Sequence, residues 1–327
     1  MNYRRLGNTE LKISELSFGT WAIGGAWGNT NDTDALAGLQ RAMEHGVNFF
    51  DTADVYGDGH SEELIAKATK GKEDEIYVAS KFCRAGDIHD PATYSEDSVR
   101  LYLENTLRRL KRDRLDLYQI HCPPIEILKD GKVFHVLDKL QAEGKIRYYG
   151  VSVETVEEGL ISMQNENVRA LQVIFNLFRQ KPVSELFPAA IERGVGILAR
   201  VPLASGLLTG KFTSDHAFQD DDHRKFNRDG QQFNVGETFG GLPFEKGVEL
   251  SNDVSWIADG RGNMTQAALR WILQHHAISS VIPGFRNVRQ VDDNIKAIEG
   301  KKFSQLEMNR LKEFYENEVH EHIRGAY

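Results

Sequence analysis

The sequence has only two cysteines, no basic excess and no long apolar run, and each scarcity argues against a class of protein. Cys83 and Cys122 are too few for a disulfide framework, and their spacing does not predict a zinc site, so we expect no metal. The 327 residues carry a formal net charge of −8 without a run of Lys and Arg, which argues against nucleic-acid binding. No stretch reaches the roughly 20 apolar residues that cross a bilayer, and the N-terminus lacks the apolar core of a signal peptide. We therefore expect a cytoplasmic protein that binds a small molecule and no membrane.

Apolar strand-like segments alternate with amphipathic helical segments along most of the chain. The strands are expected at 16–18, 47–50, 76–79, 115–120, 146–151, 170–174, 196–199 and 278–282. The helices are expected at 32–45, 61–69, 94–110, 133–142, 156–163, 184–192 and 264–275. This pattern predicts a parallel α/β fold closed into a (β/α)8 TIM barrel, with residues 1–327 forming one domain. An open doubly wound sheet is the alternative, because alternation alone does not establish closure.

Two segments lie outside this repeat. Residues 3–6 and 11–13, joined by Gly7-Asn8-Thr9-Glu10, predict an N-terminal hairpin that plugs the floor of the barrel. Residues 207–248 form a polar insertion after the seventh strand that is too long for an ordinary connection. Because it follows a strand on the active face, we expect this insertion to cover a ligand.

Polar side chains stand at the ends of three successive predicted strands. Asp51 follows the second strand and is trailed by Tyr56, Lys81 follows the third, and His121 follows the fourth. Ser61, with acidic residues behind it, is expected to open the next helix. The carboxyl ends of parallel barrel strands converge on one face, where catalytic residues are usually found. Taken singly, each residue has a simpler explanation, such as Asp51 capping a turn or Lys81 being a solvated charge.

Almost the whole chain resembles the aldo-keto reductase family. The matching segments are RRLGNTELKISELSFGTWAIGG, NFFDTADVYG, ASKF, LDLYQIHCP, GKIRYYGVS, LQVIFN, VPLASGLLTGKF and VIPGFRNVRQVDDN. The resemblance implies a (β/α)8 barrel that reduces aldehydes or ketones to alcohols with NADPH, without a Rossmann domain. It also implies a monomer.

The resemblance places four residues in a catalytic tetrad, namely Asp51, Tyr56, Lys81 and His121. Hydride delivery to a carbonyl carbon creates an alkoxide that must be protonated, and Tyr56 is the expected proton donor. A free phenol with a pKa of about 10 is a reluctant acid, so we expect Lys81 to lower that pKa and Asp51 to orient Lys81. His121 is expected to hydrogen-bond the carbonyl oxygen.

The resemblance also implies a set of cofactor-binding residues. They are Thr20, Trp21, Asp51, Ser152, Gln172, Arg200, Pro202, Leu203, Ser205, Gly206, Leu207, Lys211, Gly284, Phe285, Arg286, Gln290 and Asn294. Arg286 is the expected partner of the adenosine 2′-phosphate, which favours NADPH over NADH. The sequence departs from the family pattern at Val153-Glu154, where Asn is common, and at Arg200, where a Tyr usually stacks on the nicotinamide. Arg200 either lies against that ring or turns toward a phosphate.

Aromatic residues near the tetrad predict an apolar substrate pocket. Its expected members are Trp21, Trp27, Tyr56, Phe82 and His121. Cys83 and Cys122 lie within two residues of tetrad members, so an electrophile could modify one of them; two inert packed thiols are the alternative.

Two other functions compete with the reductase. A regulatory subunit that binds cofactor and turns over slowly would share the barrel, although the complete tetrad argues against it. A barrel lyase or isomerase acting on a phosphorylated metabolite would bind no nicotinamide.

Overall fold

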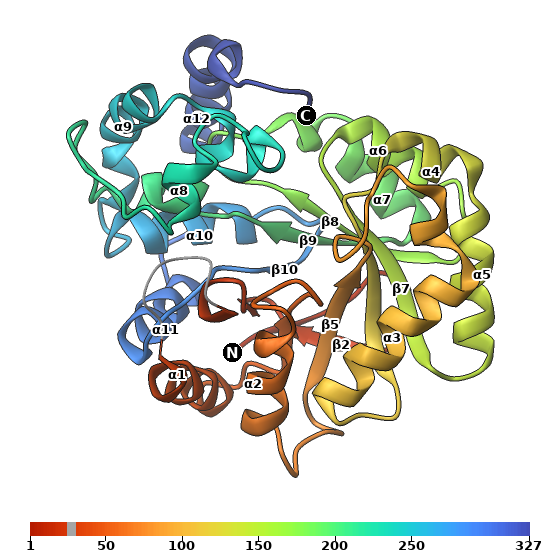
Figure 1. The fold of residues 1–327 in the computed structure, drawn as a ribbon. Helices are drawn as coiled ribbons and strands as arrows, with labels where there is room; N and C mark the ends of the chain where they lie inside the picture. The colour runs from red at the N-terminus through yellow and green to blue at the C-terminus, as the bar shows by residue number, and fades with distance from the viewer. Residues whose placement is uncertain (25–30) are drawn as a thin grey trace.

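Eight parallel strands form the centre of the molecule in the computed structural model, which describes residues 1–24 and 31–327 (Figure 1). They are β3 (Phe18–Gly19), β4 (Phe49–Asp51), β5 (Tyr77–Phe82), β6 (Leu115–His121), β7 (Ile146–Val153), β8 (Val168–Ile174), β9 (Gly196–Arg200) and β10 (Ile278–Val281). Each strand pairs in parallel with the next along the chain. Parallel bridges from Leu16 to Val281 and from Gly19 to Gly284 join the two ends of the sheet. This confirms the eight predicted strands and the barrel, rather than the open sheet.

The hairpin predicted at the N-terminus is also present. Strands β1 (Tyr3–Arg5) and β2 (Lys12–Ser14) pair antiparallel. Leu6, Leu11 and Ile13 are fully buried and belong to an apolar cluster inside the barrel. The strand side chains of this cluster are Phe49, Ala79, Leu117, Ala170 and Leu198. The hairpin therefore fills one end of the barrel and leaves the carboxyl ends of the strands for a site.

Helices surround the sheet, and the seven predicted ones are confirmed. They are α1 (Asp32–Glu44), α2 (His60–Ala68), α3 (Glu96–Leu110), α5 (Lys132–Ala142), α6 (Val156–Ser162), α7 (Leu186–Arg193) and α10 (Met264–Leu273). The sequence reading missed α4 (Ile125–Asp130) and α12 (Gln305–Phe314), and α11 (Val288–Ile295) follows β10.

The predicted start of α2 is wrong. The residue that precedes the helix is Gly59, at φ 87°, whereas Ser61 lies inside the first turn. The Ser61 hydroxyl is buried and donates to Thr20 Oγ1 at 2.5 Å, so it ties the helix to the loop after β3 instead of capping it.

The insertion after β9 folds over the carboxyl ends of the strands. It contains α8 (His223–Phe226) and α9 (Phe244–Asp253), drawn in cyan in Figure 1. Arg324, near the C-terminus, donates to the carbonyl oxygens of Gly241 and Leu242 and to Asp229 Oδ1. The tail of the chain thus holds the insertion in place.

Within the described ranges, no helix combines the length and apolar character needed to cross a bilayer.

Candidate active site

The four tetrad residues reach one face of the barrel from neighbouring strands. Asp51 ends β4, Lys81 is the penultimate residue of β5, and His121 ends β6. Tyr56 arrives on the loop after β4. That loop is fixed by Gly57, at φ 62°, where an added Cβ would stand 2.0 Å from the carbonyl oxygen of Gly24, so a side chain is excluded there.

Lys81 links the other members of the group. Its Nζ donates to Asp51 Oδ1 at 2.5 Å, to the Thr52 carbonyl oxygen at 2.8 Å and to the Tyr56 hydroxyl at 3.3 Å. The rings of Tyr56 and His121 meet edge to face, with centroids 5.9 Å apart. The structure therefore brings the four predicted side chains together, with Tyr56 between the Lys81 ammonium and the His121 imidazole.

Burial changes the expected proton affinity of Tyr56. Burial raises the phenol pKa, and the Lys81 cation lowers it without cancelling that effect, so the net pKa is above its ordinary value. Lys81 therefore lowers the Tyr56 pKa as expected, but in the free protein the desolvation of the phenolate outweighs this effect. The hydroxyl keeps its proton at neutral pH, which a proton donor requires.

Lys81 shows the opposite balance. Burial by itself would lower the pKa of this fully buried amine, but the Asp51 carboxylate and Tyr56 outweigh it and raise the pKa above its ordinary value. Asp51 also accepts from Gln172 Nε2 at 2.7 Å and Gln119 Nε2 at 3.3 Å, both on Oδ2. The carboxylate is therefore held on both oxygens and keeps Lys81 charged.

His121 is neutral in this environment. Burial lowers its pKa well below the usual value, and the cations of Arg84, Lys81 and Arg200 lower it further. Its Nδ1 has no hydrogen-bond partner among the described residues. A neutral imidazole carries one N–H, which is the group needed to donate to a carbonyl oxygen.

A cavity of about 330 Å³ opens beside Tyr56 and His121 and runs toward β10 and α11. Fourteen of the predicted cofactor residues line it: Trp21, Asp51, Gln172, Arg200, Pro202, Leu203, Ser205, Gly206, Lys211, Gly284, Phe285, Arg286, Gln290 and Asn294. The other three predicted cofactor residues do not line this cavity. Thr20 is buried and donates to the Asp51 carbonyl oxygen, Ser152 packs its hydroxyl against Cys122, and Leu207 lies in the core.

The far end of this cavity is suited to phosphate groups. Lys211, Arg224 and Arg286 line it, and Gly206 has φ 103°, a backbone conformation that side chains rarely adopt. The Arg286 amide donates to Gln290 Oε1 at 2.7 Å, which fixes the turn before α11. Arg224, on α8 of the insertion, was missed because nothing in the sequence marks where this long segment folds back.

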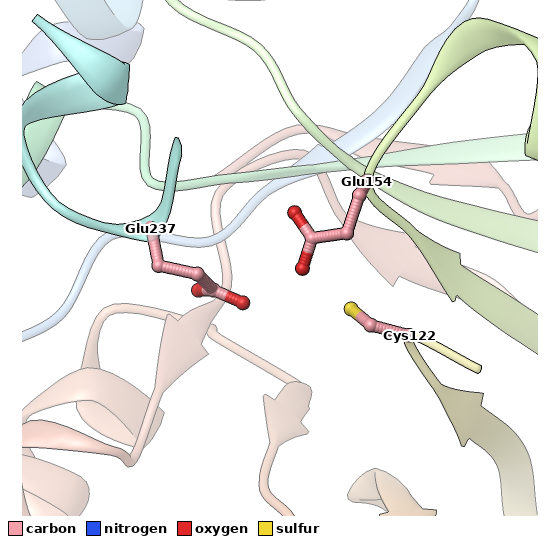
Figure 2. Close-up of side chains that lie close together, drawn as sticks. All are labelled: Cys122, Glu154 and Glu237. Carbon is pink, nitrogen blue, oxygen red and sulfur yellow. The ribbon is translucent and has the colours of Figure 1, made fainter. Parts of the chain in front are cut away.

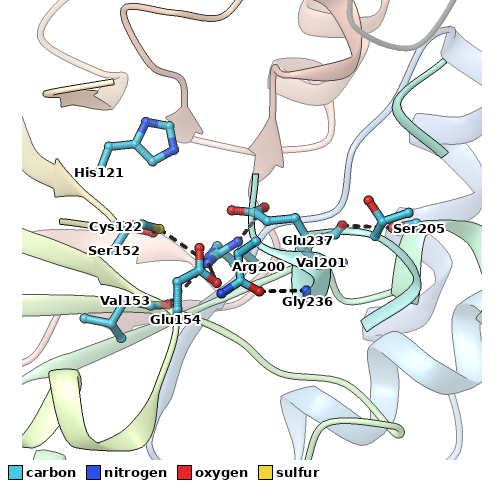
Figure 3. Close-up of polar contacts among 12 residues, drawn as sticks. His121, Cys122, Ser152, Val153, Glu154, Arg200, Val201, Ser205, Gly236 and Glu237 are labelled. Atoms are coloured by element: carbon cyan, nitrogen blue, oxygen red, sulfur yellow. Dashed lines mark hydrogen bonds and ion pairs between the residues drawn. The ribbon is translucent and has the colours of Figure 1, made fainter. Parts of the chain in front are cut away.

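The Arg200 guanidinium forms ion pairs with two carboxylates. Its Nη1 lies 2.7 Å from Glu237 Oε2 and its Nη2 lies 3.1 Å from Glu154 Oε2 (Figure 3). Arg84 Nη2 approaches Oε1 of the same two carboxylates, at 3.4 Å from Glu154 and 3.5 Å from Glu237. These four side chains, here called the Arg–Glu cluster, join the ends of β5, β7 and β9 to the insertion. The Arg200 charge is thereby balanced beside the cavity.

Two carboxylates of the cluster and the neighbouring Cys122 have the geometry of possible metal ligands. The Cys122 sulfur and a carboxylate oxygen from each of Glu154 and Glu237 lie within 4.8 Å of one another (Figure 2). Both carboxylates, however, are already ion-paired with guanidinium groups of Arg84 and Arg200, which repel a cation. The arrangement is therefore explained by the arginines.

A second cavity, of about 550 Å³, meets the first at Trp21, Tyr56, His121 and Glu237. Of the other predicted substrate contacts, Trp27 lies outside the described residues. Phe82 is wrongly predicted, because it is fully buried and stacks on Tyr118 at 4.7 Å between ring centroids.

Most of the surface that lines this second cavity is apolar, but several charged groups that the sequence did not predict also line it. Arg84, Glu154, Glu158, Glu237 and Asn234 line it, along with apolar residues such as Ile88 and Phe233. The departure at Glu154 was the one signal in the sequence for this polarity.

The two thiols resist deprotonation. Burial raises the pKa of Cys83 to about 12 and also raises the pKa of Cys122. Since the thiolate is the reactive form, this favours the interpretation of both as inert packed groups.

Comparisons with known proteins agree with this geometry. A model of the Aldo/keto reductase family matches residues 15–316. The chain belongs to this family. Among its curated relatives, "Aldo-keto reductase YhdN" of Bacillus subtilis is 31% identical, over 89% of this chain and 87% of that protein. "Probable voltage-gated potassium channel subunit beta" of Arabidopsis thaliana is 29% identical, over 91% of this chain and 92% of that protein. The glycerol dehydrogenase AKR11B4 of Gluconobacter oxydans has a similar solved structure, with TM-score 0.79 and 28% identity, covering 100% of this chain and 98% of that one.

Proposed function

We propose that this member of the aldo/keto reductase family reduces aldehydes or ketones to alcohols with NADPH, as a single domain spanning residues 1–327. One observation carries the proposal. A buried ammonium, Lys81, touches both a carboxylate and the hydroxyl of Tyr56, and that hydroxyl faces two connected cavities beside a neutral His121. Such an arrangement is suited to protonating a carbonyl oxygen.

The larger part of an NADPH molecule fits the residues of the first cavity. Lys211 and Arg286 supply positive charge for phosphates, Arg224 lines the same end with its charge paired to Asp222, and Phe285 and Trp21 supply apolar walls. Arg286 stands before α11, so it is the group we assign to the 2′-phosphate. When bound, NADPH supplies a hydride to the carbonyl carbon.

The residues of the chain supply the proton and its control. The neutral imidazole of His121 donates a hydrogen bond to the carbonyl oxygen and orients it toward Tyr56. Tyr56 gives its proton to that oxygen as negative charge develops, and the phenolate left behind lies 3.3 Å from the Lys81 ammonium. Solvent then returns the proton to Tyr56, so one proton and one hydride are consumed for each alcohol formed.

A steady-state assay tests the proposal. Purified protein mixed with NADPH and a panel of small aldehydes should oxidise NADPH steadily, with one alcohol formed for each NADPH consumed. Absence of turnover with every carbonyl compound, despite NADPH binding, would contradict it.

A second candidate is a regulatory subunit that binds cofactor, because a relative 29% identical to this chain is named as a probable channel subunit. It predicts tight NADPH binding with at most slow turnover. The assay above separates the two, since fluorescence titration measures binding and absorbance at 340 nm measures turnover. A lyase or isomerase would bind no nicotinamide in the same titration.

A further inference from the structure

The second cavity is bounded by the tetrad at one end and by the Arg–Glu cluster along one side. Tyr56 and His121 line it together with Arg84, Glu154 and Glu237. Any carbonyl compound that places its oxygen at the tetrad must therefore direct part of its remaining chain along buried charged groups.

The cluster is built to hold these groups in fixed positions. Glu154 and Glu237 are each more than nine-tenths buried. Arg200, which lines the first cavity, forms an ion pair with each of them. Figure 3 shows Arg200 between the two carboxylates. Arg84 completes the cluster from the loop after β5, and its Nε donates to the His121 carbonyl oxygen at 3.3 Å.

Hydrogen-bonding capacity remains on the cavity side of the cluster. The contacts of Arg84 with Glu154 Oε1 and Glu237 Oε1, at 3.4 and 3.5 Å, are at the long limit for a hydrogen bond. A carboxylate can accept about four hydrogen bonds and a guanidinium can donate five. A hydroxyl group is the matching ligand, because it donates to a carboxylate oxygen and accepts from a guanidinium N–H at once.

The charges of the cluster also restrict the ligand. Two guanidinium groups face two carboxyl groups. A charged substrate would therefore be attracted by one pair of groups and repelled by the other at similar distances, with no net electrostatic gain. An apolar chain would cover these groups without hydrogen-bonding them, and their desolvation would then be uncompensated.

We propose that the substrates of this enzyme are uncharged hydroxylated carbonyl compounds, and that Arg84 and Glu154 bind a substrate hydroxyl near the reacting carbonyl. This inference rests on the proposed reductase function. Arg84 and Glu154 are then specificity-determining residues, while Arg200 is a positioning residue that acts through the two carboxylates.

The first experiment compares three substrates on the wild-type enzyme with saturating NADPH. Glyceraldehyde and propanal have the same three-carbon chain and differ in their hydroxyls, and 4-oxobutanoate adds a negative charge. Rates are referred to the free aldehyde, because aldehydes hydrate to different extents in water. We expect kcat/KM for glyceraldehyde to exceed that for propanal at least about 100-fold, since sites that bind a substrate hydroxyl strongly reject the analogue without it. We expect 4-oxobutanoate to be the poorer substrate as well.

The outcomes of this comparison are distinct. Equal or better use of propanal or 4-oxobutanoate would overturn the inference and leave the reductase function standing. No NADPH oxidation with any of these aldehydes, nor with a wider panel, would instead remove the function on which the inference rests.

The second experiment changes the cluster. Arg84→Met keeps an apolar, unbranched stem and removes the guanidinium N–H donors, whereas Glu154→Gln keeps side-chain length and removes the carboxylate charge. We expect each to lower kcat/KM for glyceraldehyde at least tenfold more than it lowers kcat/KM for propanal. Glu157→Gln, at an exposed position three residues from Glu154, is the matched control and should alter neither.

A cluster that only clamps the insertion would give a different result. Both substrates would then lose activity by the same factor in either variant, and this equal loss would overturn the specificity role. If Arg84→Met fails to fold, Glu154→Gln and the wild-type comparison still decide the question.

Discussion

Replacing Asp51 with Asn should destabilise the protein severely, and the structure gives the size of the effect. The side chain of Lys81 is 0% exposed and its Nζ lies 2.5 Å from Asp51 Oδ1. At an effective dielectric constant of about 20, this attraction is about 6–7 kcal/mol. Part of it is offset because a buried carboxylate and its desolvation cost are removed too. We expect a net loss of about 3–5 kcal/mol, which is typical when one member of a buried ion pair is removed.

The loss should depend on pH in a defined direction. In the wild type, the raised pKa of Lys81 stabilises the fold at every pH below the unfolded lysine value and ceases to do so as pH rises through the folded value. In Asp51→Asn the carboxylate that raises the Lys81 pKa is gone, so we expect the effect of burial to dominate and the folded pKa of Lys81 to fall below its unfolded value. The variant therefore loses further stability as pH falls from about 10, until pH drops below the new folded pKa.

Urea unfolding of both proteins between pH 6 and pH 10 measures this directly. Asp32→Asn is the control, because Asp32 is half exposed and its pairing with Lys67 should contribute less than about 1 kcal/mol. Two results would contradict this role of the Lys81–Asp51 pair. One is a loss of less than about 1 kcal/mol in the free energy of unfolding of Asp51→Asn. The other is a difference in that free energy between variant and wild type that narrows as pH falls from about 10.

Two other predictions follow from the cofactor cavity and the thiols. Arg286→Ala should weaken NADPH binding by roughly 1–3 kcal/mol and NADH binding less, because only NADPH carries the 2′-phosphate; fluorescence titration with both cofactors checks this, and equal losses would contradict the assignment. Cys83 and Cys122 should react with iodoacetamide at pH 8 at least tenfold more slowly in the folded protein than in urea, because burial raises both pKa values. Rapid alkylation of the folded protein, followed by mass spectrometry, would show that the thiols are accessible.

The barrel could be predicted because its strands carry local signals. The segment Leu115–His121, for example, is buried at every position, and four of its seven residues are apolar. The start of α2 could not be predicted in the same way, because the choice between Gly59 and Ser61 is made by a long-range bond from Ser61 to Thr20.

Some residues of the candidate site could be predicted from the sequence and others could not. Asp51, Lys81 and His121 occupy strand ends, and strand ends meet by the geometry of a barrel, so their proximity followed from the sequence. The role of Glu237 did not, because its approach to Arg200 depends on how a long insertion folds back over the barrel. The net pKa shift of Tyr56 was also beyond reach, since it is set by the depth of burial.

The most direct test of the central claim is the Tyr56→Phe variant, studied by stopped-flow reduction and by NADPH titration. Only the hydroxyl is lost, so we expect reduction to fall by a factor of about 100 or more while the NADPH dissociation constant stays within about threefold. Reduction at the wild-type rate in this variant would show that the proton comes from a group other than Tyr56.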